Sequence, residues 1–298
     1  MNASECFLVS VGIIFVTSCT MRLLKEIFRM IQLYVSPSFL NHHPKRFGEW
    51  AVITGGSSGI GKHTAHELAK RGLKVMLISN ELEELEATAK DIETKFGVEC
   101  CYALANLTGG KEDYDNLWSK IEDKDVGIFV NCAGIAGRLP CDFLNETESN
   151  TLTMIALNVK TVISTTYRMT KMYAKKNKGI VINVSSASPI HPFPYLAIYS
   201  SCKKFIDIFT KAVNVEFVDK GIMLQSLLPF FVQTRMTNKL ITKSVFVPLC
   251  EKFCKSWIKC IGKEQSYTGY WLHEILFYCI SCYGYSPYTL LRYLLVRN

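Results

Sequence analysis

Two pairs of residues in this sequence have side chains and a spacing suited to proton transfer. Tyr199 and Lys203 stand four positions apart in "IYSSCKK", and Tyr167 and Lys171 repeat that spacing in "YRMTK". On a helix such residues share one face, one turn apart, so a lysine ammonium can lie beneath a phenol. The ammonium would favour the tyrosinate and lower the pKa of the phenol from its usual value of about 10. The spacing alone does not choose between the two pairs.

A glycine-rich loop, "VITGGSSGIG", predicts a site for a dinucleotide. Gly55, Gly59 and Gly61 come directly after an expected strand and at the start of an expected helix. Glycines there permit a tight turn and let backbone amides approach a pyrophosphate, which the positive end of the helix dipole also favours. A loop of this kind between a strand and a helix is much stronger evidence than an isolated glycine-rich turn.

The elements that must position these residues alternate along the chain from Trp50 onward. Short apolar runs predict strands at 50–54, 74–79, 99–104, 126–131, 179–186 and 222–229, and helical periodicity marks 61–72, 81–97 and 152–176. Strands that alternate with helices imply right-handed crossovers. The expected fold class is therefore α/β, with a doubly wound, Rossmann-like parallel sheet in a single domain.

An apolar segment precedes this domain. Residues 6–21 carry no charge over sixteen positions, which as a helix would span about 24 Å, slightly short of the ~30 Å hydrocarbon core of a bilayer. Arg22, Lys25 and Arg29 follow the run and Glu5 precedes it, unlike a cleaved signal peptide, and the positive-inside bias places the main domain in the cytosol. We expect residues 1–47 to be an apolar membrane anchor with an amphipathic segment; a buried or interfacial helix is the alternative.

Residues 48–298 form the expected catalytic domain. Its last part, about 235–298, is rich in aromatic and apolar residues and has few charges. Such a segment suits a lid over a substrate cavity, a membrane-contacting surface, or both.

Composition excludes several classes of function. The formal charge of +8 is scattered among acidic residues, which argues against nucleic-acid binding and fits an anionic membrane surface or cofactor better. The twelve cysteines complete no zinc-ligand pattern, so we expect free thiols, a reducing compartment and no metal. The glycosylation sequons at Asn106 and Asn183 fall in expected core strands and are interpreted as chance matches.

The spacing Thr-Gly-x3-Gly-x-Gly in the loop resembles the short-chain dehydrogenase/reductase family. "NCAG" at residues 131–134 is similar to that family's Asn-Asn-Ala-Gly segment, and "LPFFVQT" at 228–234 resembles its Pro-Gly-x3-Thr segment. In the family a catalytic serine precedes the tyrosine by thirteen residues, and an asparagine stands twenty-eight further upstream. Counting back from Tyr199 gives Ser186 and Asn158, whereas counting back from Tyr167 gives a methionine and a valine. The resemblance therefore selects Tyr199 and Lys203.

The resemblance also implies a role for each residue. Tyr199 would donate a proton to the nascent alkoxide, or remove one in reverse, with Lys203 beneath it. Ser186 would hydrogen-bond the substrate oxygen, and Asn158 would hold a water that links Lys203 to solvent. The residues expected to contact the cofactor are Gly55, Ser57, Ser58, Gly59, Ile60, Gly61, Asn80, Asn106, Asn131, Ala133, Gly134, Tyr199, Lys203 and Thr234.

Cofactor choice depends on the end of the second strand. NAD-dependent relatives carry an acid there that binds the ribose hydroxyls, and NADP-dependent relatives commonly carry an arginine one position later. This chain has Ser79 and Asn80, and so neither. We expect NADPH/NADP, with NADH/NAD as the alternative. Asn106 stands where the family usually has an adenine-contacting aspartate, so we expect a weaker contact there.

Several segments, among them "GEWAVITG", "ELAKRGLKVMLIS" and "IYSSCK", resemble the membrane-bound branch that contains 17β-hydroxysteroid dehydrogenases of types 3 and 12 and very-long-chain 3-oxoacyl-CoA reductases. This implies a hydrophobic small-molecule substrate, the endoplasmic reticulum membrane, a catalytic domain facing the cytosol and a candidate homodimer. Reduction of a 17-ketosteroid is the first expectation. Reduction of a 3-oxoacyl-CoA is the alternative, with Arg235, Lys239 and Lys243 available for the CoA phosphates or for lipid headgroups. A non-catalytic dinucleotide-binding scaffold is the hypothesis from another class.

Overall fold

The computed structural model describes residues 2–37, 43, 45–138, 141–191, 193–238 and 244–283. The chain divides into two compact units between Pro37 and Ser38. Each unit is described by itself below.

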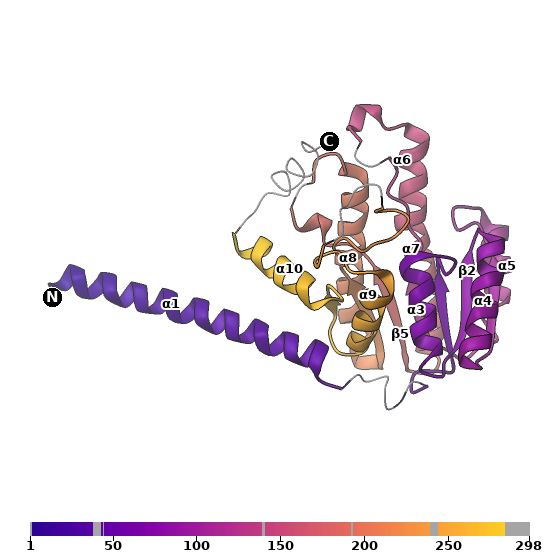
Figure 1. Cartoon of the computed structure of the whole chain (residues 1–298), viewed down its shortest axis with the longest axis horizontal. Helices are drawn as coiled ribbons and strands as arrows, with labels where there is room; N and C mark the ends of the chain where they lie inside the picture. Colours follow the sequence, from indigo (N-terminus) through magenta and orange to yellow (C-terminus); the bar gives the residue numbers. More distant parts are fainter. Residues whose placement is uncertain are drawn as a thin grey trace. The chain divides into compact units, whose positions relative to one another are not determined.

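The N-terminal unit is one long helix, α1 (Ala3–Met30), continued by a π-helical turn, η1 (Ile31–Val35) (Figure 1). Asn2 begins it with a reciprocal cap, because its side chain accepts from the amide of Glu5 while the Glu5 carboxylate accepts from the amide of Asn2. No side chain of α1 is buried. Over Ala3–Val35 the mean hydropathy reaches 2.0, and in the described part of the chain no other helix is long and apolar enough to cross a membrane. The expected apolar segment is therefore a candidate membrane anchor.

The second unit is built on a seven-stranded parallel sheet, in the order β3-β2-β1-β4-β5-β6-β7. The strands are β1 (Trp50–Thr54), β2 (Lys74–Ser79), β3 (Cys100–Leu104), β4 (Val126–Asn131), β5 (Gly179–Val184), β6 (Ile222–Leu227) and β7 (Ser266–Tyr267). The order reverses between β1 and β4, and the register places Thr54 beside Asn131 and Asn131 beside Asn183. Parallel strands with such a switch point form a crevice at their carboxyl ends, where ligands bind. The predicted doubly wound fold is confirmed.

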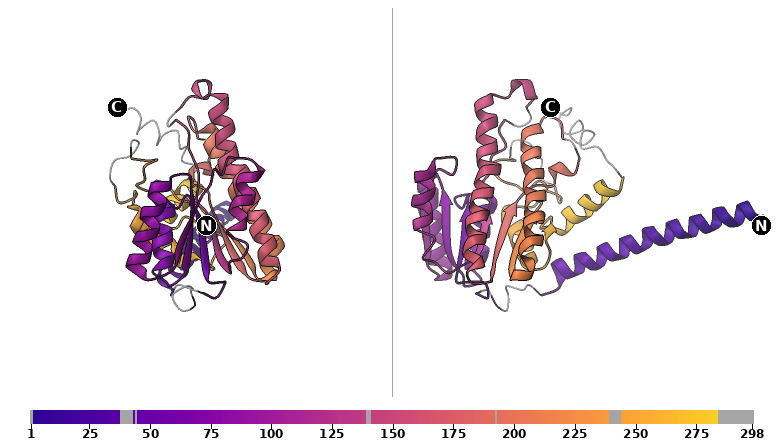
Figure 2. Two further views of the ribbon diagram at one scale, coloured as in Figure 1. Left: turned by 90° about the vertical axis from the view of Figure 1, so that its right-hand side faces the viewer. Right: turned by 180° about the vertical axis from the view of Figure 1, so that it is seen from behind.

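Helices cover both faces of this sheet (Figure 2). On one face lie α3 (Gly59–Ala69), α4 (Leu82–Phe96) and α9 (Cys250–Trp257), and α9 packs against α3. The other face carries α5 (Lys111–Ser119), α7 (Thr161–Ala174) and α8 (Ala197–Phe217); α6 (Glu148–Ile155) leads into α7 through the π turn η3 (Ala156–Lys160). The last described helix is α10 (Trp271–Tyr283).

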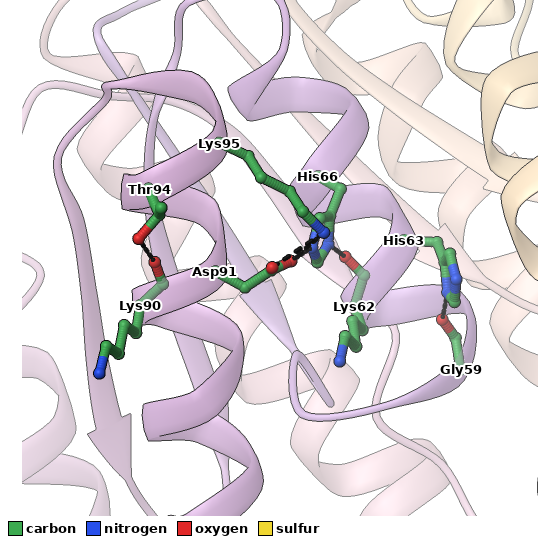
Figure 3. A network of polar contacts seen from close by, with 8 residues as sticks. All are labelled: Gly59, Lys62, His63, His66, Lys90, Asp91, Thr94 and Lys95. Atoms are coloured by element: carbon green, nitrogen blue, oxygen red, sulfur yellow. Dashed lines mark hydrogen bonds and ion pairs between the residues drawn. The ribbon is translucent and has the colours of Figure 1, made fainter.

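A polar network joins the neighbouring helices α3 and α4 (Figure 3). The imidazole of His66 on α3 lies 2.7 Å from the carboxylate of Asp91 on α4, and Lys95 donates to the same carboxylate. Lys95 and His66 together hold the pKa of Asp91 below its usual value. One turn earlier on α3, the ring of His63 donates to the carbonyl oxygen of Gly59 at 2.8 Å. The last turn of α3 is thus tied to α4 through Asp91, and its first turn is bonded within the helix through His63.

Two expectations from the sequence bear on the compartment. Asn183 is fully buried in β5, as expected, but Asn106 is exposed in the loop after β3 and does not lie in a strand. The predicted strand and β3 both end at Leu104, so the interpretation that placed Asn106 in a core strand is wrong. All twelve cysteines are free thiols. Within the described ranges, no three His, Cys, Asp or Glu side chains cluster closely enough to hold a metal ion.

Candidate active site

The loop between β1 and α3 requires glycine at its ends. Gly55 has φ +67°, and a Cβ there would lie 3.0 Å from the Cα of Ala133. A Cβ on Gly61 would overlap the carbonyl oxygen of Gly55, because the loop folds back on the first turn of the helix. Only glycine combines this backbone conformation with this close approach. The loop therefore lies directly against the segment that follows β4.

The start of α3 is arranged to bind an anion. Ser58 stands at the N-cap, but its side chain makes no capping hydrogen bond. The amides of the first turn, which includes Gly59, Ile60 and Gly61, have no intrahelical acceptors, and the helix dipole adds partial positive charge. These features fit the pyrophosphate of a dinucleotide.

Two segments from the second half of the chain support this loop. The methyl group of Thr234, in the loop after β6, would lie 3.7 Å from a Cβ on Gly59. On α9, the thiol of Cys254 lies 3.4 Å from the carbonyl oxygen of Ile60. The sequence predicts Thr234 beside the cofactor, but it predicts nothing of Cys254 beyond a free thiol. No local signal identifies α9 as the support of α3.

The segment after β4 links the loop to the predicted catalytic residues. The hydroxyl of Thr54 accepts hydrogen bonds from the amides of Cys132 and Ala133, at 3.0 and 3.1 Å. A Cβ on Gly134 would lie 2.7 Å from the Oδ1 atom of Asn158 and 3.4 Å from the Nζ atom of Lys203. Gly134 is therefore the point at which the cofactor loop region meets the predicted catalytic residues.

Asn131 lies in the same segment, but its side chain belongs to the core. Its amide donates to Asn183 at 2.8 Å, and its oxygen accepts from Thr165 at 2.8 Å. Asn183 in turn donates to Thr210 on α8. These buried hydrogen bonds join β4 and β5 to α7 and to α8, which carries the predicted catalytic residues Tyr199 and Lys203. The side chain of Asn131 therefore holds neighbouring core elements together and does not face the cofactor site.

Asn158 is fully buried in the π turn η3. Its side-chain amide donates to the carbonyl oxygen of Ile135 at 2.7 Å, and its oxygen accepts from the amide of Ile135 at 3.3 Å. π turns inside α-helices are frequent at functional sites, because the extra residue redirects a side chain. Here the redirected side chain holds the loop after β4 against α7.

Ser186, Tyr199 and Lys203 lie together at the carboxyl end of β5. Ser186 follows β5 by two residues, and its oxygen accepts from the amide of Ser188 at 3.0 Å. Tyr199 and Lys203 are one turn apart on α8, with the lysine Nζ 5.7 Å from the centre of the phenol ring. Lys203 is buried and donates to the carbonyl oxygen of Val184 at 2.8 Å. Tyr167, by contrast, is 67% exposed on α7.

Burial dominates the pKa values of Tyr199 and Lys203. Burial raises the pKa of Tyr199 to about 12, and a hydrogen bond with Ser186 opposes this shift. Burial also lowers the pKa of Lys203 to about 8. In the protein alone, loss of solvation outweighs the ammonium of Lys203, which bonds to Val184 instead. The lowering that we expect from Lys203 together with the positive charge of the oxidised cofactor stays a prediction.

The end of β2 also differs from the expectation, since an acid does stand there. The hydroxyl of Ser57 donates to the Glu81 carboxylate at 2.6 Å and lies 2.9 Å from the hydroxyl of Ser79. The expectation from Ser79 and Asn80 missed Glu81, the next residue, although an acid about 20 residues after the glycine loop is the usual spacing for ribose recognition. Asn80 itself is exposed.

The remaining predicted contacts are at the edge of the site or beyond it. The Asn106 side chain is exposed and accepts from the amide and hydroxyl of Thr108, at 3.1 and 2.8 Å. Arg235 pairs with Glu81 at 3.3 Å. Lys239 and Lys243 lie outside the described residues.

Comparison with known proteins agrees with this arrangement. A family profile described as short chain dehydrogenase matches residues 49–244. The chain is 35% identical over 272 residues to a very-long-chain 3-oxoacyl-CoA reductase of Rattus norvegicus, covering 91% of this chain and 86% of that protein. It is also 35% identical over 257 residues to a Homo sapiens protein named inactive hydroxysteroid dehydrogenase-like protein 1, covering 85% of this chain and 78% of that one.

Among solved structures, the chain is similar to a short-chain dehydrogenase from Sphingobium yanoikuyae in complex with NADPH. The TM-score is 0.65 at 24% identity, over 70% of this chain and 82% of that chain. At this identity the likeness shows the fold alone. The family profile and the curated relatives each cover most of the sequence. The chain therefore belongs to the short-chain dehydrogenase family, NAD(P)-dependent oxidoreductases that act on alcohol and carbonyl groups.

Proposed function

We propose that the chain is an NAD(P)H-dependent carbonyl reductase for a hydrophobic ketone. The observation that carries the proposal is the convergence of Asn158, Ser186, Tyr199 and Lys203 beside Gly134, at the carboxyl ends of the strands. The loop at Gly55–Gly61 fits the dinucleotide, which would supply the hydride.

The side chains of the site divide the work of protonating the carbonyl oxygen. A pKa of about 12 keeps the Tyr199 hydroxyl protonated at neutral pH, so it is ready to donate. The hydroxyl of Ser186 bonds to Tyr199 in the free protein, so a substrate oxygen that lies between the two would take a hydrogen bond from each. Two donors at one oxygen orient the carbonyl and stabilise the negative charge that develops on it.

Lys203 and Asn158 would replace the proton that Tyr199 gives up. The pKa of Lys203, about 8, is close enough to neutral pH for the ammonium to release and regain a proton. Asn158 donates to the backbone of Ile135, the residue after Gly134, and a Cβ on Gly134 would lie 3.4 Å from the Nζ atom of this lysine. We assign to Asn158 the placement of a water that connects Lys203 to solvent.

For the substrate we propose a 3-oxoacyl-CoA first and a 17-ketosteroid second. The sequence favours the opposite order. The rat relative that matches nearly the whole chain is named a very-long-chain 3-oxoacyl-CoA reductase, and that name supports the thioester. The hydroxysteroid dehydrogenase-like name of the human relative supports the steroid.

The same proposal places the enzyme on a membrane. The helix Ala3–Val35 has the length and hydropathy to cross a bilayer, and Arg22, Lys25 and Arg29 follow its uncharged part. The positive-inside bias then supports a catalytic domain in the cytosol, and the family resemblance supports the endoplasmic reticulum membrane.

A second copy of the chain is the proposed protein partner. The outer face of α8 exposes Phe205, Ile208 and Val215, which recur at three and seven positions and so share one face. The rings of Phe205 and Phe209 stack beside each other on this face. Sedimentation of the detergent-solubilised chain would test for the homodimer.

The function is tested by dinucleotide oxidation. Full-length protein reconstituted in lipid is given NADPH or NADH with matched panels of 3-oxoacyl-CoA esters and 17-ketosteroids. Turnover of either panel supports the reductase, and the panel that reacts ranks the substrates. Dinucleotide binding without turnover of any ketone would contradict the proposed reductase and favour a non-catalytic scaffold. The word "inactive" in the name of the human relative supports that second hypothesis.

A further inference from the structure

A buried histidine on α10 takes no part in the proposed reaction. His273 is fully buried, and its Nε2 atom lies 3.0 Å from the carbonyl oxygen of Phe246, in the segment before α9. Burial lowers the pKa of His273 to about 4, against the opposing effect of the backbone at Phe246 and Phe231, so the imidazole is neutral at neutral pH. Because a carbonyl oxygen can only accept, the hydrogen of this neutral ring stands on Nε2 and Nδ1 carries a lone pair. Among the residues that the structure describes, none forms a hydrogen bond with Nδ1.

Packing alone does not explain a histidine at this position. The centre of its ring lies 5.6 Å from that of Phe230, 5.9 Å from that of Phe253 and 5.2 Å from that of Tyr270. A phenylalanine would fill such an aromatic surrounding without the cost of a buried nitrogen that lacks a partner. The hydrogen bond from Nε2 to Phe246 is therefore the property that distinguishes histidine here.

The helix that carries His273 is fixed to the sheet. The carboxylate of Glu274, the next residue, accepts from the amide of Thr268 at 2.7 Å. The hydroxyl of Thr268 donates to the carbonyl oxygen of Tyr270 at 3.2 Å. Thr268 follows β7 directly, and both Thr268 and Glu274 are buried. The first turn of α10 is thus held at the end of β7, so His273 is a fixed support for the segments that it contacts.

The segment Pro229–Thr234, after β6, crosses the candidate active site. At one end, the carbonyl oxygen of Pro229 accepts from the amide of Ala187, the residue after Ser186, at 3.0 Å. At the other end, Thr234 lies close to Gly59 of the phosphate loop. The segment therefore runs from the predicted catalytic serine to the phosphate loop, and the family resemblance implies that the nicotinamide end of the dinucleotide lies against it.

His273 supports this segment at two points. The first is Phe230, which stands where the family pattern Pro-Gly-x3-Thr has glycine and which packs against the imidazole. The second is reached through Phe246, because Pro248, two residues further on, accepts from the amide of Gln233 at 3.0 Å. The hydrogen bond from His273 to Phe246 thus fixes the part of the chain that pairs with Gln233, at the end of the segment.

We propose that His273 is a positioning residue that holds the nicotinamide end of the bound dinucleotide in place through the segment Pro229–Thr234. The proposal rests on the dinucleotide site of the proposed function. Loss of the hydrogen bond to Phe246 loosens the part of the chain that pairs with Gln233, while the phosphate loop is untouched. The dinucleotide then still binds, but its nicotinamide ring moves more freely and transfers hydride more slowly.

The test compares variants that remove or keep the hydrogen bond to Phe246. His273→Phe keeps an aromatic ring but has no donor, His273→Asn places its amide near the position of Nδ1, and His273→Gln places its amide near that of Nε2. Each full-length, detergent-solubilised protein is titrated with NADPH or NADH, whichever the wild-type chain binds more tightly. All dissociation constants stay within about threefold of the wild-type value. The time-resolved fluorescence anisotropy of the bound nicotinamide decays faster in His273→Phe and His273→Asn, and His273→Gln keeps the slow decay of the wild-type chain.

Ketone reduction gives a second measurement on the same proteins. His273→Phe and His273→Asn lower kcat by about tenfold or more with little change in the KM for the ketone, because hydride transfer is the slowed step. The kinetic isotope effect from dinucleotide deuterated at the transferred position rises for the same reason. Tyr173→Phe is the matched control. It removes a hydrogen bond of 3.4 Å from another buried carbonyl oxygen, that of Ile180, and it leaves the anisotropy decay and kcat at their wild-type values.

The outcomes separate this inference from the proposed function. Wild-type anisotropy decay in His273→Phe and His273→Asn, or equally fast decay in His273→Gln or Tyr173→Phe, overturns the inference and leaves the proposed function standing. Either of the first two variants decides if the other does not fold. The predicted anisotropy pattern in a chain that reduces no ketone supports the inference and overturns the proposed reductase. Failure of the wild-type chain to bind either dinucleotide overturns both.

Discussion

The ammonium of Lys203 lies 5.7 Å from the centre of the Tyr199 ring and gives its hydrogen bond to the carbonyl oxygen of Val184, 2.8 Å away. The lysine is thus bound to the end of β5 and not to the phenol it lies beside. Burial keeps the phenol protonated, with a pKa of about 12, and brings the pKa of the lysine down to about 8. At neutral pH the Tyr199 hydroxyl is therefore protonated and can donate its proton, whereas the positive charge on buried Lys203 destabilises the folded state.

Replacing that lysine should stabilise the fold while abolishing activity. The folded pKa of Lys203 is lowered to about 8 from 10.5, so its contribution to stability is present above about pH 10.5 and is lost as pH falls through 8. The shift corresponds to about 3 kcal/mol, offset in part by the bond to Val184 worth about 1 kcal/mol. At pH 7, Lys203→Met should therefore raise the free energy of unfolding by about 1–2 kcal/mol.

Urea denaturation of the full-length chain at pH 7 and pH 10 checks this prediction. The gain should shrink at the higher pH, where the wild-type lysine is largely neutral in the folded state. Lys171→Met, in the pair of the same spacing on α7, is the matched control and should give no gain at either pH. A gain for Lys203→Met that is equally large at both pH values would contradict the assigned cause.

Gly134→Ala tests the junction between the loop and the catalytic residues. The added Cβ would lie 2.7 Å from the Oδ1 atom of Asn158 and 3.4 Å from Lys203. Displacing these groups should lower kcat/KM by about tenfold to 100-fold, with the fold intact because only side-chain ends must shift. Gly110→Ala, where a Cβ would meet nothing within 4 Å, should keep full activity in the same ketone-reduction assay. Equal activity of the two variants would show that the junction does not position the site.

Asn131 and Asn106 should have opposite effects. Asn131→Ala leaves the buried partners Asn183 and Thr165 without their bonds, so the free energy of unfolding should fall by about 2–3 kcal/mol, with dinucleotide affinity preserved. Asn106→Ala removes an exposed side chain in the proposed adenine contact, so it should weaken dinucleotide binding and leave stability nearly unchanged. Unfolding curves and dinucleotide titrations on both variants separate the two roles; the reverse pattern would exchange them.

The fold and the candidate catalytic set can be predicted from the sequence because both depend on the order of residues along the chain. Apolar runs that alternate with amphipathic stretches predict the six longer strands, whereas the two residues of β7 have no periodicity to detect. Fixed spacings lead from Tyr199 to Ser186 and Asn158, and Gly134 confirms that Asn158 and Lys203 meet. Because helices and strands are rigid, a fixed number of residues between two side chains leaves little freedom in where those side chains lie.

The direction in which a side chain points and the extent of its burial cannot be predicted from the sequence in the same way. The motif around Asn131 fixes its place at the end of β4, but the sequence does not show that its side chain turns into the core. The position of Lys203 is predicted, yet the pKa values of Lys203 and Tyr199 depend on burial by segments far along the chain. The contact of Glu81 with Arg235 joins residues 154 positions apart, so no local sequence pattern predicts it.

The most direct test of the account compares two tyrosine variants in the ketone-reduction assay. Tyr199→Phe should lose about 100-fold or more in kcat while it binds dinucleotide as the wild-type chain does, because only the donated proton is removed. Tyr167→Phe, in the other Tyr–Lys pair, should reduce the ketone at the wild-type rate. Full turnover by Tyr199→Phe, or an equal loss in Tyr167→Phe, would contradict the assignment of Tyr199 as the acid.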